Sequence, residues 1–267
     1  MNQINDIGWQ ELMVSLLMLF IPISFLAYYK VGIIKPLLIS VFRMMAQLGL
    51  VAVYLEWVFE RNNPWINLLW VLIMIFVGVM TAIRRVDLQW KTFIIPMLVA
   101  GITSVMIVDA FFLGWVIKLE FIFDARYFIP ITGMILGNSL NNNVIGLNEY
   151  LTNLRDKSDL YYFILGNTNT QKLALRPFIS NAFIKALNPT IATMSVMGLI
   201  ALPGMMTGQI LGGSPPAEAI KYQIMIMLAI FIGSSLNLIL SVVLVRWFVF
   251  DGLGNLKTNK VFLKIKK

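Results

Sequence analysis

The sequence of 267 residues contains no cysteine and no histidine. Without cysteine there are no disulfides, thiolate metal sites or cysteine nucleophiles, and without histidine the commonest metal ligand and general base is missing. The phosphate-binding loop G-x-x-x-x-G-K-[ST] does not occur either, so we expect no ATP to bind through such a loop. These absences exclude most enzyme chemistries, and no residue pattern assigns metal ligands. We expect a chain that is not an enzyme and carries no cofactor of its own.

Charge is also scarce, at 13% of residues, whereas 59% are hydrophobic and the mean hydropathy is +0.81. A soluble domain of this length cannot bury so much apolar surface in one core, so lipid has to cover part of it. A helix needs roughly 20 apolar residues to cross the hydrocarbon layer. Seven runs of about that length occur, at residues 11–29, 36–57, 64–83, 92–116, 127–147, 190–211 and 219–248. The prediction is an all-α, polytopic integral membrane protein with a single transmembrane domain over residues 1–267.

The distribution of Lys and Arg predicts the orientation of these helices. With the N-terminus outside, sixteen of the 21 basic residues lie in the cytoplasm, and Arg43 lies within a helix. The four left outside are Arg61, Lys118, Arg126 and Lys221. Because cytoplasmic segments of membrane proteins are enriched in basic residues, we expect a cytoplasmic C-terminus with a basic tail at about residues 249–267. The net charge of +8 therefore indicates topology in a multi-pass cell-membrane protein, and not nucleic-acid binding.

The first run is expected to remain as a membrane helix. No basic residue precedes it, Asp6 and Glu11 flank it, and no small-residue cleavage site follows. A secretory signal peptide has the opposite features.

The longest segment between runs covers about residues 150–189, on the side assigned to the cytoplasm. Gly166 is expected to end one helix, and Thr168 to Gln171 has the T-x-x-Q form of a capping box that begins another. Apolar residues then recur at helical spacing, with an interruption expected at Pro177 and an end at Asn188-Pro189. This amphipathic helix either lies on anionic lipid or docks with a cytoplasmic partner. The candidate docking residues are Gly166, Asn167, Thr168, Gln171, Leu175 and Phe178.

Glycines recur at four-residue spacing in the fifth and sixth runs. In lipid, such faces let helix backbones approach closely, which matters because no hydrophobic effect drives the helices together. Pro203 weakens the helical hydrogen-bond ladder, so the sixth helix is expected to be bent or broken near mid-membrane. Packing without any transport role explains these motifs equally well. The candidate packing residues are Gly133, Gly137, Pro203, Gly204, Gly208 and Gly212.

Polar side chains inside the apolar runs are candidates for lining a path across the membrane. Arg43 and Gln47 are four residues apart and share a helix face, and a buried guanidinium needs a partner. Extension of Arg43 toward the inner interface is the alternative. The methionines of the sixth run suit either a path or the filling of packing gaps. The candidates are Arg43, Gln47, Met134, Asn138, Asn141, Met205, Met206, Gln209, Gln223 and Asn237.

Two glycine-methionine blocks carry a resemblance to a known family. Residues 130–138 read P-I-T-G-M-I-L-G-N, and residues 202–208 read L-P-G-M-M-T-G. With these blocks in this order, nearly the whole chain resembles the FetB-type permeases, which are ABC transporter subunits for iron export and are related to plant aluminium-tolerance permeases. The run Asn141 to Asn143 and the pairs Asn167-Thr168 and Ser180-Asn181 depart from the family's usual pattern, and these departures leave the cargo open.

The resemblance implies the permease of an ATP-driven exporter, of metal ions such as iron. It also implies a homodimer of permeases with two copies of a separate cytoplasmic ATPase, which binds ATP and Mg²⁺. Two other functions remain open. One is a secondary transporter or channel that works alone, for which Asp109 is the candidate buried acidic site. The other is a membrane scaffold that recruits a partner without transport.

Overall fold

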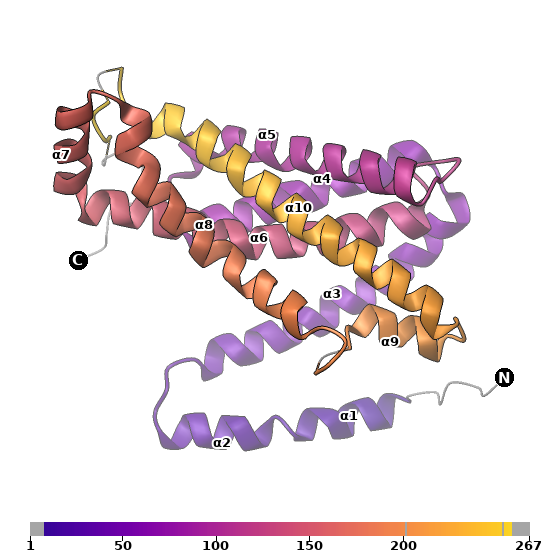
Figure 1. Cartoon of the computed structure of the whole chain (residues 1–267). Coiled ribbons are helices and arrows are strands. Elements are labelled where there is room, and N and C mark those ends of the chain that lie inside the picture. Colours follow the sequence, from indigo (N-terminus) through magenta and orange to yellow (C-terminus); the bar gives the residue numbers. More distant parts are fainter. Residues whose placement is uncertain (1–7, 201, 253, 258–267) are drawn as a thin grey trace.

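The computed structural model describes residues 8–200, 202–252 and 254–257, and this part of the chain is helical apart from loops and isolated bridges such as that between Phe250 and Leu256 (Figure 1). The elements are α1 (Trp9–Leu17), α2 (Phe20–Tyr28), α3 (Ile34–Arg61), α4 (Pro64–Arg85), α5 (Trp90–Asp109), the π-helix η1 (Ala110–Val116), α6 (Ala125–Asp156), α7 (Ser158–Thr168), α8 (Gln171–Val196), α9 (Gly204–Leu211) and α10 (Pro216–Val249). The predicted all-α class is confirmed.

Five helical stretches in the described residues are long and apolar enough to cross a membrane. They are Gln10–Tyr28, Ile34–Arg61, Pro64–Arg85, Trp90–Val116 and Pro216–Val249. The two other predicted runs lie in different surroundings. Residues 127–147 form part of α6, where several asparagines lower the hydropathy, and residues 190–211 do not form one helix.

The sixth predicted helix is broken, as Pro203 indicated. Helix α8 ends at Val196, and α9 begins at Gly204 with Pro203 as its N-cap residue. Gly198 lies in the break with φ of +84°, a conformation that L side chains rarely adopt. The chain thus changes direction between two helices, although the apolar run of residues 190–211 continues through the break in the sequence.

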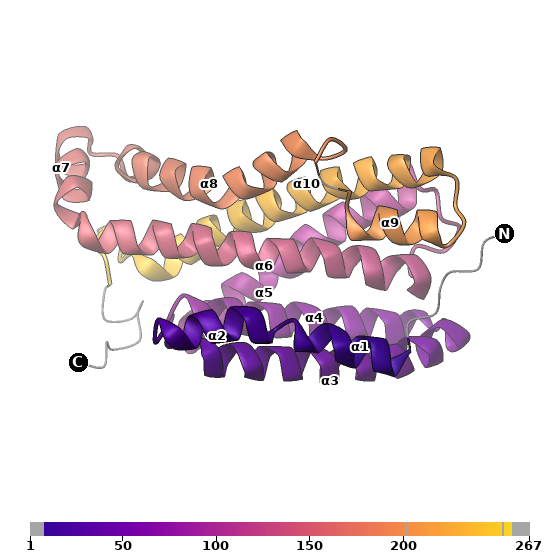
Figure 2. The ribbon, with the colours of Figure 1, turned by 90° about the horizontal axis from the view of Figure 1, so that it is seen from below.

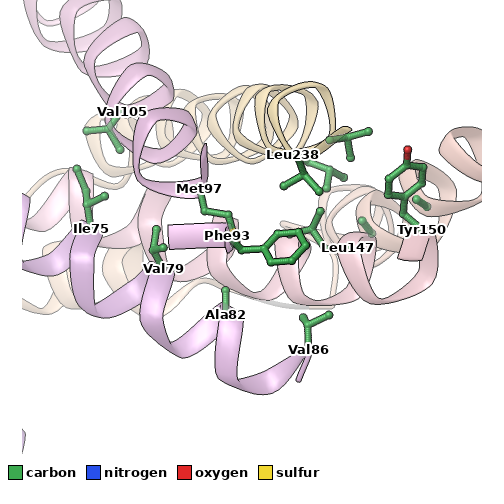
Figure 3. Close-up of a cluster of buried hydrophobic side chains, with 14 of the residues drawn as sticks. Ile75, Val79, Ala82, Val86, Phe93, Met97, Val105, Leu147, Tyr150 and Leu238 are labelled. Carbon is green, nitrogen blue, oxygen red and sulfur yellow. The ribbon is translucent and has the colours of Figure 1, made fainter. Parts of the chain in front are cut away.

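Helices α4, α5, α6, α8 and α10 pack around one apolar core (Figure 3). In it, Val79 of α4, Phe93 and Met97 of α5, Leu147 of α6 and Leu238 of α10 converge. All five side chains are buried, and each apolar residue of this kind contributes on the order of 1.5–3 kcal/mol where burial removes it from water. Within the bilayer, close packing of the side chains stabilises the helix contacts instead. These helices, together with η1, α7 and α9, are called the body below.

Three glycines let the helices of the body approach closely. A Cβ atom added at Gly146 of α6 would lie 2.7 Å from the Leu238 side chain, and one at Gly233 of α10 would lie 2.6 Å from Ile135. One at Gly101 of α5 would lie 3.0 Å from Ile75. These glycines are therefore packing positions that hold α4, α5, α6 and α10 together.

Helices α1, α2 and α3 form an arm along one side of the body (Figures 1 and 2). In the candidate spans of this arm no part of the most apolar window is buried. The arm meets the body at a small cluster in which Val58 is buried and the rings of Tyr54 and Trp70 stack with centroids 4.1 Å apart. Most of the arm's apolar surface thus faces outward, where lipid or another chain covers it.

Most of the described basic residues lie in helix ends and loops at one end of the molecule. The α2–α3 loop, the end of α4, α7 with the adjoining ends of α6 and α8, and the end of α10 lie at one end of the molecule (Figure 1). Helix α9 and the start of α10 lie at the other end. Helix α1 begins at the second end. The predicted basic tail is described only to Lys257, and its remaining residues, 258–267, lie outside the described residues.

Three sequence predictions about α7 and α8 are wrong. Helix α7 continues through Gly166 and ends at Thr168, where Asn169 adopts a left-handed conformation with φ of +48°. The hydroxyl of Thr168 donates to the carbonyl of Ile164 and does not cap α8, so no capping box forms. Helix α8 runs unbroken through Pro177 and Pro189, because tertiary packing overrides the local cost of proline.

Candidate functional site

A buried polar seam joins α6 to α10. The amide Nδ2 of Asn143 donates to Oδ1 of Asn237 at 2.7 Å and to the hydroxyl of Ser241 at 3.3 Å. One to two turns away, the hydroxyls of Ser139 and Ser234 lie 3.4 Å apart. All five side chains are buried. Such bonds fix the register of two helices in lipid, where an unpaired polar group is costly.

The seam borders a small enclosed space of about 20 Å³, lined by Asn143, Asn237 and apolar or glycine residues of α4, α5 and α6. That volume is about the size of one water molecule. The Oδ1 atom of Asn143 is buried and has no hydrogen-bond partner among the described residues. The space is therefore of the right size and polarity to let one water satisfy that oxygen.

A larger polar cavity of about 500 Å³ lies beside the seam, between α6, α8 and α10 and the last residue of α4. Its polar lining consists of Arg85, Asn138, Asn141, Asn142, Thr190 and Thr193. The Arg85 guanidinium donates to Oδ1 of Asn141 at 3.4 Å, and Nδ2 of Asn142 donates to the Thr190 hydroxyl at 3.4 Å. These amides and hydroxyls gather in one place because α6 carries asparagines on the face that meets α8.

A second large cavity, of about 530 Å³, is mostly apolar and lies where the arm meets the body. Gln47 of α3 lines it together with Trp70 and Met74 of α4 and with Gly133 and Gly137 of α6. Gln47 of α3 and Thr81 of α4 are thus the polar side chains that line a mostly apolar space.

The structure distributes the predicted path residues over these features and does not bring them to one channel. Asn138 and Asn141 line the polar cavity, Asn237 lies in the seam, and Gln47 lines the apolar cavity. Arg43 is exposed on α3 and lines none of these features. Met134 is half-buried and packs against the core.

The remaining path candidates lie on α9 and α10. Met205 packs against the core, and Met206 and Gln209 are half-buried. Gln223 is buried, and its Nε2 atom lies 3.9 Å from the sulfur of Met197 in the break after α8. The Oε1 atoms of Gln209 and Gln223 are both buried without a hydrogen-bond partner among the described residues. Polar groups without partners thus collect next to the broken helix.

The predicted packing glycines are mostly unpartnered within one chain. A Cβ atom at Gly137, Gly204 or Gly208 would meet nothing within 4 Å, and one at Gly212 would meet only the backbone of its own helix. Gly133 differs, because a Cβ atom there would lie 3.1 Å from Met74. Gly204, Gly208 and Gly137 therefore make no close approach within one chain, and their packing role stays a prediction for contact with a second chain. The close approaches are at Gly101, Gly146 and Gly233. The four-residue spacing of glycines did not identify them, because each of these glycines meets a larger side chain.

The predicted docking residues divide into two groups. Leu175 and Phe178 are buried against the body, so they cannot contact a partner directly, and that part of the prediction is wrong. The stripe is apolar because it packs on α6, as the ion pair between Lys185 of α8 and Glu149 of α6 at 2.6 Å also indicates. Gly166, Asn167 and Thr168 are exposed at the end of α7, and Gln171 is half-buried.

Helix α7 forms an exposed corner at the basic end of the molecule (Figure 1). Its inner side is held by Tyr161, which is buried and donates from its hydroxyl to the carbonyl of Gly254 at 2.8 Å. Burial raises the pKa of Tyr161, so the hydroxyl stays protonated as a donor. On the outer side, Phe163 is 69% exposed beside Asn167, which makes this corner available for contact.

Sequence reasoning missed Arg85, Thr190 and Thr193 as cavity residues. Arg85 was interpreted only as a topology signal, and the two threonines lie in the stretch where α8 continues past Pro189. Among the described residues, no group of three or more His, Cys, Asp or Glu side chains lies close enough together to hold a metal ion.

The fold and these cavities define the class: an all-helical, multi-pass membrane protein with polar residues buried between its helices. The chain belongs to the UPF0014 family, described as an uncharacterised protein family, which it matches over residues 9–250. No solved structure matches it.

Three relatives illustrate the family. The chain is 30% identical over 256 residues to "UPF0014 membrane protein YjkA" of Bacillus subtilis (strain 168), covering 93% of this chain and 99% of the relative. It is 30% identical over 242 residues to "Probable iron export permease protein FetB" of Escherichia coli (strain K12), covering 89% and 90%. It is 29% identical over 189 residues to "Protein ALUMINUM SENSITIVE 3" of Arabidopsis thaliana, covering 70% and 67%. The predicted resemblance to FetB-type and plant aluminium-related proteins is confirmed.

Proposed function

We propose that this chain is the membrane-spanning permease of an ATP-driven exporter whose ATPase is a separate cytoplasmic polypeptide, and that it exports metal ions such as iron. The observation that carries the proposal is the match, along about nine-tenths of both chains, to a relative named as an iron export permease. A permease without a phosphate-binding loop of its own needs a partner to supply the energy.

The topology we propose has seven crossings with α1 beginning outside. Five crossings are the apolar stretches named above. The other two are the membrane part of α6 and the broken pair α8 and α9, where the polar seam and the break account for the lower hydropathy. This orientation puts α7 and the end of α10 in the cytoplasm of a bacterial cell, in accord with the rule for basic residues. Because the chain has no cysteine of its own, labelling of Asn255→Cys by an impermeant reagent tests it, and labelling from outside contradicts it.

The exposed corner at the end of α7 is the proposed docking surface for the ATPase. Asn167, Thr168 and Phe163 are accessible there, and the buried face of α8 passes any movement of the corner on to α6. A rigid helix buried along its length transmits displacement, because its packed core does not deform continuously. Two permeases are expected in the complex, with the open glycines Gly137, Gly204 and Gly208 available to a second copy.

Co-purification with the ATPase tests the docking surface. Phe163→Asp and Asn167→Asp place charge in the corner without touching the core, so both variants are expected to insert normally and to lose the ATPase and ATP-dependent transport in vesicles. Asp159→Asn, on the same helix at an exposed position nearer its start, serves as the control. If the two corner variants bind the ATPase as the wild type does, the corner is not the docking surface. The proposal of an ATP-driven exporter then loses this support.

A stand-alone ion-coupled transporter is the second candidate, because α5 carries a buried carboxyl. Asp109 is 3% exposed, and its Oδ2 atom accepts a hydrogen bond of 2.6 Å from the Thr132 hydroxyl of α6. Its Oδ1 atom has no partner among the described residues, and the π-helix η1 begins at the next residue. Intramembrane carboxyls of this kind serve proton and ion coupling. Transport by the purified chain without an ATPase, abolished in Asp109→Asn, is the result that this candidate requires.

A further inference from the structure

The polar cavity between α6, α8 and α10 has a charge and donor pattern that selects one kind of ligand. Its single charged lining residue is Arg85, and none of the eleven lining residues is Asp or Glu. No carboxylate among the described residues lies within ion-pair distance of Arg85. A bare metal cation would meet an unneutralised guanidinium here, which disfavours its binding.

The hydrogen bonds of the cavity leave donors free. Arg85 uses one of its five N–H groups for Asn141, and the Nδ2 group of Asn141 has no partner among the described residues. The Thr190 hydroxyl accepts from Asn142, so its own proton is available. By contrast, Thr193 already donates to the carbonyl of Pro189 at 2.9 Å. The free groups thus include several donors around one positive charge, beside the amide oxygens of Asn138 and Asn142, which accept no hydrogen bond from the described residues.

An apolar wall completes the cavity. Val144 and Ile145 of α6 and Met227 and Ile230 of α10 line it beside the polar residues. The volume of about 500 Å³ falls in the range of ligand sites in proteins, and it is far larger than a single oxyanion requires. A ligand that fills it therefore carries an anionic group at one end and apolar atoms at the other.

We propose that this cavity binds a phosphate group attached to an apolar moiety, with Arg85 as the anion ligand and Asn141 and Thr190 as further donors. A guanidinium binds phosphate through paired N–H groups, which is the geometry that arginine favours. The phosphate belongs either to a soluble phosphate ester or to the headgroup of an anionic lipid. The site does not rest on the proposed exporter function, because it is defined by the residues of this chain alone.

The chain offers a matched control for Arg85. Arg84 precedes it on the same helix end, is also exposed, and does not line the cavity. Arg85→Gln and Arg84→Gln therefore remove the same charge from the same region of the membrane surface. Arg85→Lys keeps the charge and loses the paired geometry.

The experiment measures binding to the purified permease without any ATPase. In the first arm, phenyl phosphate is titrated into permease in phosphatidylcholine nanodiscs by calorimetry. In the second, lipid retained from vesicles containing phosphatidylglycerol is compared with that from phosphatidylcholine vesicles by native mass spectrometry. We expect binding in at least one arm, weakened about tenfold to a hundredfold in Arg85→Gln, unchanged in Arg84→Gln and intermediate in Arg85→Lys.

The two arms separate the possible sources of the phosphate. Binding of phenyl phosphate identifies a soluble ester, and selective retention of phosphatidylglycerol alone identifies a lipid headgroup. Absence of binding in both arms overturns the proposal, and so does an equal loss in Arg84→Gln and Arg85→Gln. If Arg85→Gln does not fold, Arg85→Lys still tests the proposal, because this variant is also expected to bind more weakly than the wild type. Failure of the ATPase to co-purify overturns the exporter function and leaves this outcome unaffected.

Discussion

The body and the arm both contain strongly apolar helices, yet only the body is held together by its own chain. The stretch Pro216–Val249 has a mean hydropathy of 2.4 and half of its most apolar window is buried, whereas Gln10–Tyr28 has 2.0 and none of it is buried. Apolarity makes both stretches membrane helices, but it does not decide which helices pack. Packing in lipid follows from small residues and hydrogen bonds, and these are concentrated in the body.

The largest expected effect comes from breaking a close approach in the body. Gly146→Leu forces a side chain against Leu238 and Ala186, and we expect loss of folded protein or a fall in stability of about 3 kcal/mol or more. Gly49→Leu of α3 is the matched control in the arm, because nothing lies within 4 Å of its added Cβ atom. Thermal unfolding in detergent, followed by size-exclusion chromatography, measures both. Equal losses would show that the arm is as tightly packed as the body.

A smaller effect is expected from the polar seam. Asn143→Leu removes two buried hydrogen bonds to α10 and leaves Asn237 partly unpaired, at a cost of about 1–3 kcal/mol. Asn138→Leu, at an exposed position of the same helix that bonds only its own helix backbone, should change stability much less. The same unfolding assay compares them. A neutral Asn143→Leu would mean that apolar packing alone aligns α6 and α10.

The contact between arm and body offers the third test. Trp70→Ala removes the ring that stacks on Tyr54, which is expected to loosen α3 and to leave the unfolding of the body nearly unchanged. Val58→Cys, at a position 1% exposed, is a reporter in a chain that has no other cysteine. We expect Trp70→Ala to increase the maleimide labelling rate of this cysteine several-fold. An unchanged rate would indicate that further contacts hold the arm.

The smallest effect concerns the ion pair between Lys185 of α8 and Glu149 of α6. Lys185 lowers the pKa of Glu149 below the usual 4.5 by a hydrogen bond to its carboxylate. A carboxyl with a depressed pKa contributes stability above its unfolded pKa and loses that contribution as pH falls through its folded pKa. Lys185→Ala is expected to cost at most about 1 kcal/mol at pH 7 and less at pH 3. Melting temperatures at the two pH values check this, and Lys172→Ala serves as the exposed control.

Sequence periodicity predicted the elements of the arm and body well, and failed where local signals were overridden. The prolines at 177 and 189 indicated helix boundaries that do not exist, because α8 gains more from packing on α6 than two prolines cost. The T-x-x-Q pattern at Thr168 correctly indicated a helix start, since α8 begins at Gln171, but the predicted cap does not form. The stripe of Leu175 and Phe178 was correctly predicted as one apolar face, and only the structure shows that α6 covers it. An apolar helix face indicates that something covers it, but the sequence does not indicate which segment that is.

The sequence indicated several residues of the candidate site, but it did not indicate that they lie together. The asparagines of α6 stood out in the sequence, but Arg85 and Thr190 lie 56 and 48 residues away from Asn141 and Asn142, their hydrogen-bond partners. No local pattern joins residues at such separations.

By itself the sequence determined that this chain is a helical membrane protein, which end of it is basic, and which family it belongs to, because hydropathy, charge and short glycine-methionine blocks are local properties of the chain. Only the tertiary structure decided which glycines are contacts, which apolar face is covered, and which polar residues share a cavity. The physical reason is that packing and hydrogen bonding between helices depend on side chains far apart in sequence, and a helix carries the same pattern of residues whether lipid, a neighbouring helix or a second chain lies against it.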